Sequence, residues 1–336
     1  MTAERPIKAS GTSRRGRSVL VTGGAGFIGS HLTEALLRRG DRVVVLDNFD
    51  PFYDPAIKRG NLAGLVNAPR FTLIEGDLLS DDDLERTFAT AQYDAVIHLA
   101  ARAGVRPSLA DPELYDRINV LGTTRLLQRV RSHRVGHLVF GSSSSVYGST
   151  TPVPFREDQA ADRPSSPYAA TKRAGELACY AFHELYGVPV TCLRLFTVYG
   201  PRQRPEMAIH RFTRLLAAGK TVPVFGNGSA RRDFTYVDDI VAGILAAVDH
   251  PSGYRVYNLG TTQTTRLDDL VHLIADALGV SLRMRLAPAM AGDVPITYAD
   301  ISRARQDLGY RPLTSIEAGI EAFISWFQKQ SLASAA

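Results

Sequence analysis

The chain has 336 residues, of which 45% are hydrophobic and 22% are charged. These values are typical of a globular protein and exclude a long disordered or fibrous chain. The net charge of +5 comes without a long Lys/Arg run, so we expect no nucleic-acid partner. No apolar run approaches the roughly 20 residues that span a bilayer, so we expect no membrane partner.

The sequence holds two cysteines, Cys179 and Cys192. Two cysteines are too few for a disulfide framework or a zinc site, so we expect no metal. The tail before residue 18 lacks the apolar core of a signal peptide, which predicts a cytoplasmic location.

The first half of the chain alternates short apolar runs with amphipathic stretches. The runs are rich in Val, Ile and Leu without strict alternation, as expected of parallel strands that are buried on both faces. We predict strands at 18–22, 42–46, 72–75, 95–99, 137–140 and 189–195. We predict helices at 27–39, 82–89, 112–130 and 167–186. This rhythm predicts an α/β fold of the Rossmann type, a doubly wound parallel sheet with its ligand crevice beyond the carboxyl ends of the strands.

The sequence pattern changes after residue 195, where Pro and Gly residues separate shorter predicted elements. We therefore expect a Rossmann domain over 18–195 and a smaller, mixed α/β substrate-binding lobe over 196–332. A helix at 237–249 and a strand at 255–259 are expected to return to the main sheet. The second lobe is thus predicted to be discontinuous, with return elements near 234–260.

A glycine-rich turn follows the first predicted strand. Gly23 suits a tight turn, Gly26 allows the backbone to approach a pyrophosphate, and Gly29 lets the following helix pack closely on the sheet. Phe27 and Ile28 open that helix, whose free N–H groups and positive dipole end favour phosphate. The spacing Gly-x-x-Gly-x-x-Gly, between a strand and a helix, predicts a dinucleotide site.

Asp47 ends the second predicted strand, 18 residues beyond Gly29. An acid at this place accepts hydrogen bonds from the adenosine ribose and repels a 2′-phosphate, so we predict NAD as the cofactor. Further segments follow the third and fourth strands. We expect Asp77 and Leu78 beside the adenine, although Asp77 could instead cap the next helix, and we expect the nicotinamide to be lined by Leu99, Ala100 and Ala101.

Tyr168 and Lys172 are spaced i, i+4 and so share one face of a predicted helix. A lysine ammonium near a phenol stabilises the phenolate and lowers the phenol's pKa toward the working pH. Ser165-Ser166-Pro167 signals the start of this helix. A run of serines around Ser143, at the end of the fifth strand, offers hydroxyls that can hold a substrate OH group and share its proton with Tyr168.

From residue 18 to 327 the chain resembles the NAD-dependent epimerase/dehydratase family of extended short-chain dehydrogenases. Ser143, Tyr168 and Lys172 match the family's catalytic triad. The resemblance implies that Ser144 and Ser145 face the sugar and that Asn48 and Asn119 lie near the cofactor. It also implies a homodimer formed through the helices at 112–130 and 167–186.

Later segments resemble the family's nucleotide-sugar site. Phe225 and the stretch 231–239, in which Arg232 would contact the diphosphate, match this pattern. Asp293 matches a residue that reaches the uridine ribose. Met290 departs from the pattern, because relatives often carry a polar residue or Arg there.

The stretch 194–208 resembles the branch that epimerises UDP-glucuronate at C4. The resemblance implies that Thr197, Arg204 and Met207 contact the sugar, and Arg204 suits a C6 carboxylate because its planar fork matches that group. The stretch 104–108, which includes Arg106, and the stretch 47–54 also resemble this branch. We therefore expect an NAD-dependent isomerase that interconverts UDP-glucuronate and UDP-galacturonate through a transient 4-keto sugar.

Three other functions remain open at this point. A UDP-glucose or UDP-N-acetylglucosamine 4-epimerase would use the same chemistry on another UDP-sugar. A nucleotide-sugar dehydratase or decarboxylase would need carboxyl groups where this chain has Ser144 and Ser145. A non-catalytic NAD-binding regulator would not need the complete set of Ser143, Tyr168 and Lys172.

Overall fold

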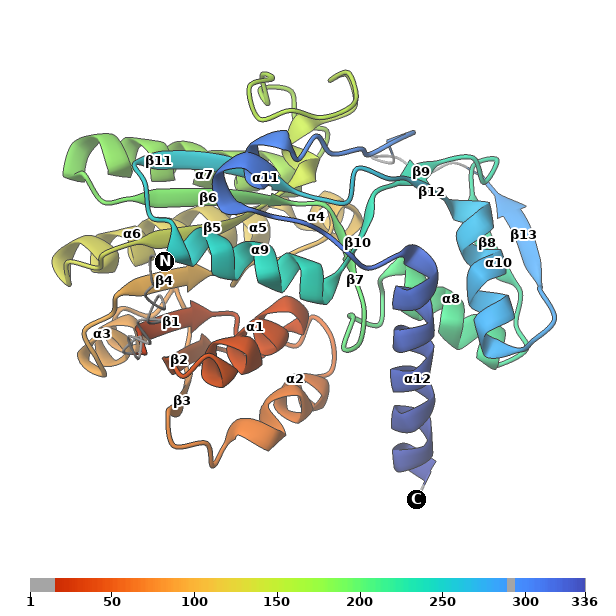
Figure 1. The fold of residues 1–336 in the computed structure, drawn as a ribbon, viewed down its shortest axis with the longest axis horizontal. Coiled ribbons are helices and arrows are strands. Elements are labelled where there is room, and N and C mark those ends of the chain that lie inside the picture. Colours follow the sequence, from red (N-terminus) through yellow and green to blue (C-terminus); the bar gives the residue numbers. More distant parts are fainter. Residues whose placement is uncertain (1–15, 289–293, 336) are drawn as a thin grey trace, which may run out of the picture.

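Figure 1 shows the computed structural model, which describes residues 16–288 and 294–335. Its centre is a sheet of seven parallel strands, in the order β11-β6-β5-β4-β1-β2-β3. These strands are β1 (Ser18–Thr22), β2 (Arg42–Asp47), β3 (Phe71–Glu75), β4 (Ala95–His98), β5 (Leu138–Ser143), β6 (Val190–Leu195) and β11 (Tyr254–Leu259). The strand order reverses between β1 and β4, which is where a doubly wound sheet opens its ligand crevice.

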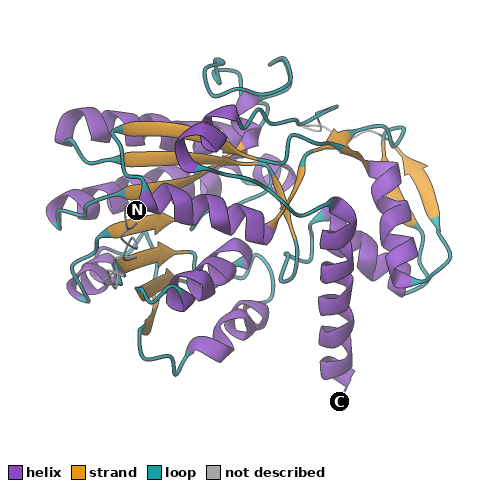
Figure 2. Ribbon diagram, viewed as in Figure 1, coloured by secondary structure: helices purple, strands orange, loops and turns teal. Residues whose placement is uncertain are grey.

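Helices cover both faces of this sheet, and each face has its own apolar core (Figure 2). Successive residues of β1 point to opposite faces, so Val19 belongs to one core and Leu20 to the other. The first core is covered by α1 (Phe27–Arg38), α9 (Val237–Asp249) and α11 (Ser302–Leu308). The second is covered by α3 (Asp81–Ala89), α6 (Gly122–Ser132) and α7 (Pro167–Tyr186).

Short elements fill the connections on the carboxyl side of the sheet. They are α2 (Pro55–Leu62), η1 (Ala63–Leu65), α4 (Val105–Ala110), α5 (Pro112–Tyr115), η2 (Asp116–Leu121) and η3 (Ser144–Tyr147). The segment predicted as one helix over 112–130 is therefore divided, because η2 is a π-helical turn between α5 and α6. Asn119 lies in this wider turn and bonds to Arg102 and Thr171, and such contacts are invisible to helical periodicity.

A smaller lobe lies beside the carboxyl ends of the strands (Figure 1). It contains β7 (Thr197–Tyr199), β8 (Val222–Phe225), β9 (Arg231–Arg232), β10 (Phe234–Tyr236), β12 (Thr265–Arg266) and β13 (Met284–Ala287). Its helices are α8 (Ala208–Ala217), α10 (Leu267–Leu278) and α12 (Ile316–Ala335). A third apolar core, which includes Phe212, Ile274 and Phe323, holds the lobe together. The predicted fold class, a doubly wound parallel sheet with a mixed α/β lobe, is confirmed.

Two functional features are not found among the described residues. No helix in 16–288 or 294–335 is long and apolar enough to cross a membrane. Within the same ranges, no group of three or more His, Cys, Asp or Glu side chains could hold a metal ion.

Candidate active site

A cavity of about 410 Å³ lies at the carboxyl ends of the central strands, between the sheet and the smaller lobe. Small-molecule sites of doubly wound proteins lie at this place. Nearly all the residues that the sequence assigns to the cofactor line it: Gly23, Gly26, Phe27, Ile28, Gly29, Asp47, Asn48, Asp77, Leu78, Leu99, Ala100, Ala101, Tyr168 and Lys172. Ser143, Ser144, Ser145, Thr197, Arg204 and Met207 line it as well.

The glycine-rich turn between β1 and α1 has the close contacts that require glycine. Gly23 has a φ of 73°, a left-handed conformation that side chains rarely adopt. A Cβ atom on Gly29 would lie 2.1 Å from the carbonyl oxygen of Gly23, so a larger residue would push the helix off the turn. A Cβ on Gly26 would meet only that same oxygen, at 3.3 Å, which is a tight contact but a milder one than at Gly29. Among the described side chains, none caps α1 at Gly26, which leaves the helix start open to an anion.

Asp47 fixes this turn from the end of β2. Its carboxylate oxygens accept hydrogen bonds from the backbone N–H of Ala25, at 3.0 Å, and of Phe49, at 2.9 Å. Burial raises the pKa of this carboxyl group, while these two bonds oppose the rise. Next to it, the amide nitrogen of Asn48 donates to Asp77 at 2.8 Å. Asp77 also accepts the backbone N–H of Leu79, at 2.8 Å, and lines the cavity.

The helix α7 places Tyr168 and Lys172 against the end of β5. Ser166 caps this helix by accepting the backbone N–H of Ala169, at 3.1 Å. The Nζ atom of Lys172 donates to the carbonyl oxygen of Gly141, at 2.7 Å, and burial lowers the pKa of this lysine to about 8. Burial raises the pKa of Tyr168, while the Ser143 hydroxyl and the charge of Arg204 lower it. The phenol therefore lies within the influence of both the β5 hydroxyl and the Arg204 side chain.

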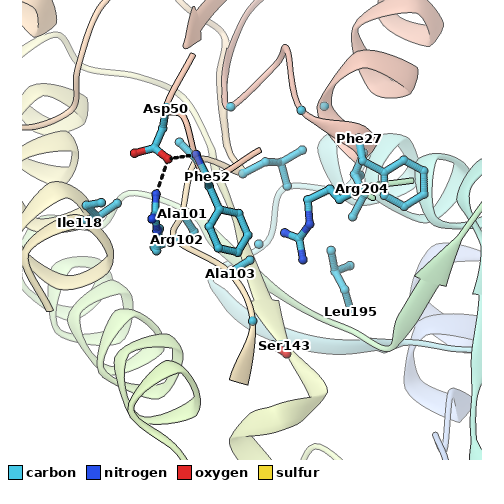
Figure 3. Close-up of a pocket in the computed structure, with 18 of the residues that line it drawn as sticks. Phe27, Asp50, Phe52, Ala101, Arg102, Ala103, Ile118, Ser143, Leu195 and Arg204 are labelled. Carbon is cyan, nitrogen blue, oxygen red and sulfur yellow. Dashed lines mark hydrogen bonds and ion pairs between the residues drawn. The ribbon is translucent and has the colours of Figure 1, made fainter. Parts of the chain in front are cut away.

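Arg204 comes from the loop after β7 and lines the cavity. Figure 3 shows its guanidinium group near Phe52 and Leu195, and the guanidinium carbon is 5.8 Å from the centre of the Phe52 ring. Its Nε atom is 2.8 Å from a carboxylate oxygen of Glu206, but it lacks hydrogen-bond geometry to any described group. The neighbouring Arg202 points elsewhere and pairs with Glu34 of α1, at 2.6 Å.

The segment after β2 closes the cavity with side chains that the sequence prediction did not assign to the site. Phe52, Tyr53 and Lys58 line the cavity, and Phe52 stacks on Arg102 with 4.6 Å between guanidinium carbon and ring centre. Arg102 also pairs with Asp50, as the dashed line in Figure 3 marks. The resemblance of the stretch 47–54 to one branch of the family pointed to Phe52 and Tyr53. It did not show which groups these side chains contact.

Several predicted residues do not line the cavity. Asn119 lies behind it and clamps the backbone of Arg102 by two hydrogen bonds, of 2.8 and 2.9 Å. Arg106 stacks on Phe225, with 4.7 Å between guanidinium carbon and ring centre, farther along the boundary with the smaller lobe. Arg232 donates to the carbonyl oxygen of Arg231, at 2.9 Å. Met290 and Asp293 lie outside the described residues.

Comparisons with known proteins agree with this geometry. Residues 19–260 match the model of the NAD dependent epimerase/dehydratase family. The UDP-glucuronate 4-epimerase 4 of Arabidopsis thaliana is 42% identical over 334 residues, which cover 94% of this chain and 76% of that protein.

Solved structures give the same result. A UDP-glucuronic acid 4-epimerase from Bacillus cereus, crystallised with UDP-glucuronic acid and NAD, has a TM-score of 0.88 and 36% identity, covering 93% of this chain and 99% of that one. A UDP-glucose 4-epimerase from Thermotoga maritima, crystallised with UDP-glucose, has a TM-score of 0.87 and 32% identity, covering 94% and 99%. The cavity and these likenesses together establish that the chain belongs to the NAD dependent epimerase/dehydratase family.

Proposed function

We propose that this protein is a UDP-glucuronate 4-epimerase, which interconverts UDP-glucuronate and UDP-galacturonate with NAD held in the cavity. The observation that carries the proposal is the closeness of two groups. Arg204 and Tyr168 line the same cavity, and the charge of Arg204 lowers the pKa of the phenol. A single sugar ring can therefore present its C4 hydroxyl to Tyr168 while its C6 carboxylate reaches Arg204.

The residues of the glycine-rich turn fit NAD. A Cβ on Gly29 would collide with the turn, and at Gly26 no side chain caps the helix start, so its N–H groups can meet a diphosphate. Asp47 supplies the carboxylate that accepts a ribose hydroxyl and opposes a 2′-phosphate. The chemistry that NAD supplies when bound is the reversible removal of a hydride from C4 of the sugar.

The proton of the C4 hydroxyl passes to Tyr168. Ser143 holds the hydroxyl through its side chain, and Lys172 stabilises the phenolate form of Tyr168 by its charge. The same tyrosine returns the proton once the 4-keto sugar has turned its other face toward the cofactor. The hydroxyls of Ser144, Ser145 and Thr197 line the cavity and offer hydrogen bonds to the sugar in both orientations.

The carboxylate needs a firm partner, because a 4-keto glucuronate is a β-keto acid that readily loses CO₂. Arg204 can bind the carboxylate through two parallel hydrogen bonds and so fix its plane. Met207, at the start of the next helix, supplies an apolar wall beside it. Phe225 and Arg106 would hold the uracil end of the substrate, and Arg232 and Asp293 its diphosphate and ribose.

A second candidate keeps the chemistry and changes the sugar. Glu206 already lies 2.8 Å from Arg204, so the arginine has a counter-charge even when the sugar is neutral. This observation favours some activity on UDP-glucose or UDP-N-acetylglucosamine. A dehydratase or decarboxylase is disfavoured, because the positions of Ser144 and Ser145 offer hydroxyls and no carboxyl group. The complete set of Ser143, Tyr168 and Lys172 disfavours a non-catalytic regulator.

Proton NMR of the purified protein with UDP-glucuronate tests the function. We expect a new anomeric signal from UDP-galacturonate, with or without added NAD. Conversion of UDP-glucose or UDP-N-acetylglucosamine alone would move the assignment to the second candidate. A UDP-pentose product would overturn the epimerase assignment in favour of a decarboxylase.

We also propose that the chain acts in the cytoplasm as a homodimer. The support for the dimer is the exposed apolar side chains of η2 and α7, which include Leu121, Leu177 and Tyr180, with exposed fractions of 44%, 53% and 47%. The support for the location is that Cys179 and Cys192 are both free. Light scattering tests the dimer, because Leu177→Glu should halve the mass, whereas Leu313→Glu, on an exposed loop away from this face, should leave it unchanged.

A further inference from the structure

Three side chains on one face of α7 contact three consecutive residues at the end of β5. They are spaced i, i+4 and i+8, so each lies one turn after the last. The pairs are Tyr168 with Ser143, Lys172 with the carbonyl oxygen of Gly141 at 2.7 Å, and Glu176 with the hydroxyl of Ser142 at 2.6 Å. The first two pairs belong to the proposed catalytic set. The third has no assigned role.

Glu176 is fully buried and paired with an equally buried cation. Two nitrogens of Arg194, on β6, donate to its two carboxylate oxygens at 2.9 Å each, and Arg173 adds a contact of 2.8 Å. Arg194 in turn stacks on Tyr147, with 4.7 Å between guanidinium carbon and ring centre. Among the described residues that line the cavity, neither Glu176 nor Arg194 occurs.

A buried ion pair of this kind is a poor device for stability. Its desolvation cost often cancels the attraction, so well-packed apolar residues would serve the fold equally well. Stability alone therefore does not explain a buried carboxylate one helical turn after Lys172, and its charge is placed to act on that lysine.

We propose that Glu176 is a positioning residue for the epimerase reaction: its charge keeps the proton that Tyr168 and Lys172 share on the lysine, so that Tyr168 is a phenolate. The inference rests on the proposed function, because it concerns the base of that reaction. A pair holding one proton has two forms, phenol with amine and phenolate with ammonium. Glu176 is one turn from Lys172 and two turns from Tyr168, so its negative charge stabilises the ammonium more than it destabilises the phenolate.

The surroundings of Lys172 make this bias necessary. Burial lowers the pKa of Lys172 to about 8, while the buried Cys179 and, less strongly, Glu176 oppose the fall. His98 is neutral because burial and the charge of Lys172 lower its pKa to about 3. Among the described acidic side chains, Glu176 is the carboxylate that acts on Lys172.

The other charged and titratable groups are placed as follows. Arg173 on α7 and Arg194 on β6 face Glu176, and the hydroxyl of Tyr254 on β11 donates to its backbone carbonyl at 3.1 Å. Around Tyr168 lie Arg204 and the ring of Tyr115, whose centre is 6.2 Å from that of Tyr168.

The test is a pH titration of phenolate absorbance in the full chain with its cofactor bound. The signal of Tyr168 is isolated by subtracting the spectrum of the matching Tyr168→Phe protein. We expect Glu176→Gln to move the appearance of this phenolate upward by about one pH unit, because the lysine loses the charge that holds its proton. The kcat for UDP-glucuronate should fall about tenfold with KM unchanged, since Glu176 touches no substrate.

Arg173→Met is the matched control. It breaks an ion pair to the same carboxylate but leaves the carboxylate and its charge in place, so the phenolate should appear at the same pH as in the unsubstituted protein or lower. Glu176→Asp, which keeps the charge, should restore most of the titration. If Glu176→Gln does not fold, Glu176→Met with Arg194→Met removes the carboxylate without leaving a buried unpaired cation. An upward shift smaller than that of Glu176→Gln is expected, because the loss of the Arg194 cation partly offsets the loss of the carboxylate.

Two results would overturn the proposal. One is an unchanged phenolate titration in Glu176→Gln, and the other is an equal upward shift in Arg173→Met. The titration needs no substrate, so its outcome is separate from that of the function. Loss of the function would appear instead as an unsubstituted protein that converts no UDP-sugar.

Discussion

The two sides of the cavity differ in how far backbone or side chains form their surface. The side that we propose for the cofactor is built around close backbone contacts, in the turn after β1 and the strand ends of β2 and β4, with glycines where a Cβ would collide. The side that we propose for the sugar consists of side chains such as Phe52, Thr197 and Arg204, which come from the loop after β2, from β7 and from the loop after β7. A surface made of backbone is fixed by the fold itself. A surface made of side chains can change its ligand while the fold stays the same.

This difference predicts where substitutions act. Changes on the cofactor side should damage the fold and the cofactor site together, because both depend on one turn. Changes on the sugar side should alter the choice of substrate and leave stability almost untouched. The helix α7, which carries the proposed base Tyr168, should show both kinds of effect.

Gly29→Ala should have the largest effect. The new methyl group would lie 2.1 Å from the carbonyl oxygen of Gly23, so the helix must move away from the turn. We expect a loss of about 3 kcal/mol in the free energy of unfolding, as for severe overpacking, together with the loss of NAD binding. Denaturant unfolding and cofactor titration measure the two effects.

The matched control is Gly60→Ala in α2, where a Cβ would meet nothing within 4 Å. It should be neutral or slightly stabilising, because alanine favours a helix over glycine. Equal losses in the two variants would mean that the close contact at Gly29 is not what shapes the turn.

Arg204→Ala should change the substrate preference and little else. Hydrogen bonds to a charged group contribute about 1.5–3 kcal/mol, so kcat/KM for UDP-glucuronate should fall roughly 10- to 150-fold. The value for UDP-glucose should fall less than about threefold, because a neutral sugar makes no such bond. Arg202→Ala is the control, since Arg202 pairs with Glu34 outside the cavity. A comparable loss on both sugars would remove the carboxylate role of Arg204.

Lys172→Met should abolish the activity and increase the stability of the protein. The pKa of Lys172 is about 8 in the folded protein against an ordinary value of 10.5. Below pH 8 the lysine is charged in both states, so folding must bury a charge and stability is lowest. Between pH 8 and 10.5 the unfolded chain binds more protons than the folded one, so stability rises with pH. Above pH 10.5 the lysine is neutral in both states, and the cost of burying its charge is gone.

This penalty amounts to about 3 kcal/mol, less about 1 kcal/mol for the hydrogen bond to Gly141. At pH 7 the inactive methionine variant should therefore be more stable by about 2 kcal/mol, and the advantage should shrink toward pH 10.5. Urea unfolding at several pH values checks this. An advantage that does not vary with pH would show that burial of the lysine charge is not its source.

The fold around the glycine-rich turn is the part that the sequence predicted best. Strand, glycine turn, helix and acid follow one another within 30 residues of sequence, so local pattern alone specifies the arrangement from Ser18 to Asp47. The same holds for Tyr168 and Lys172, because one helix fixes their spacing. The helix α7 has the predicted bounds, Pro167–Tyr186.

The sugar side could not be predicted in this way. Phe52 and Arg204 are separated by about 150 residues of sequence and meet only through the tertiary fold, so no local period relates them. The π-helical turn at η2 depends likewise on the contacts of Asn119 with Arg102 and Thr171. Arg202 and Arg204 look equivalent in the sequence, yet one pairs with α1 and the other lines the cavity. Tertiary packing, and not the local sequence, determines which groups these side chains contact.

Asp47 is an exception to this difference between the two sides, because it is a side chain on the side that we propose for the cofactor. Its two oxygens each accept a backbone N–H, from Ala25 and Phe49. Asp47→Asn keeps the shape but replaces one acceptor with a donor, and it removes the charge that opposes a 2′-phosphate. We expect NAD affinity to fall about tenfold and the preference for NAD over NADP to narrow by at least as much, for the loss of one hydrogen bond. Binding titrations with both cofactors measure this, with Glu75→Gln at the exposed end of β3 as the control. If the preference stays as it was while affinity falls, Asp47 serves only to hold the turn, and the cofactor side would then be selective through its backbone alone.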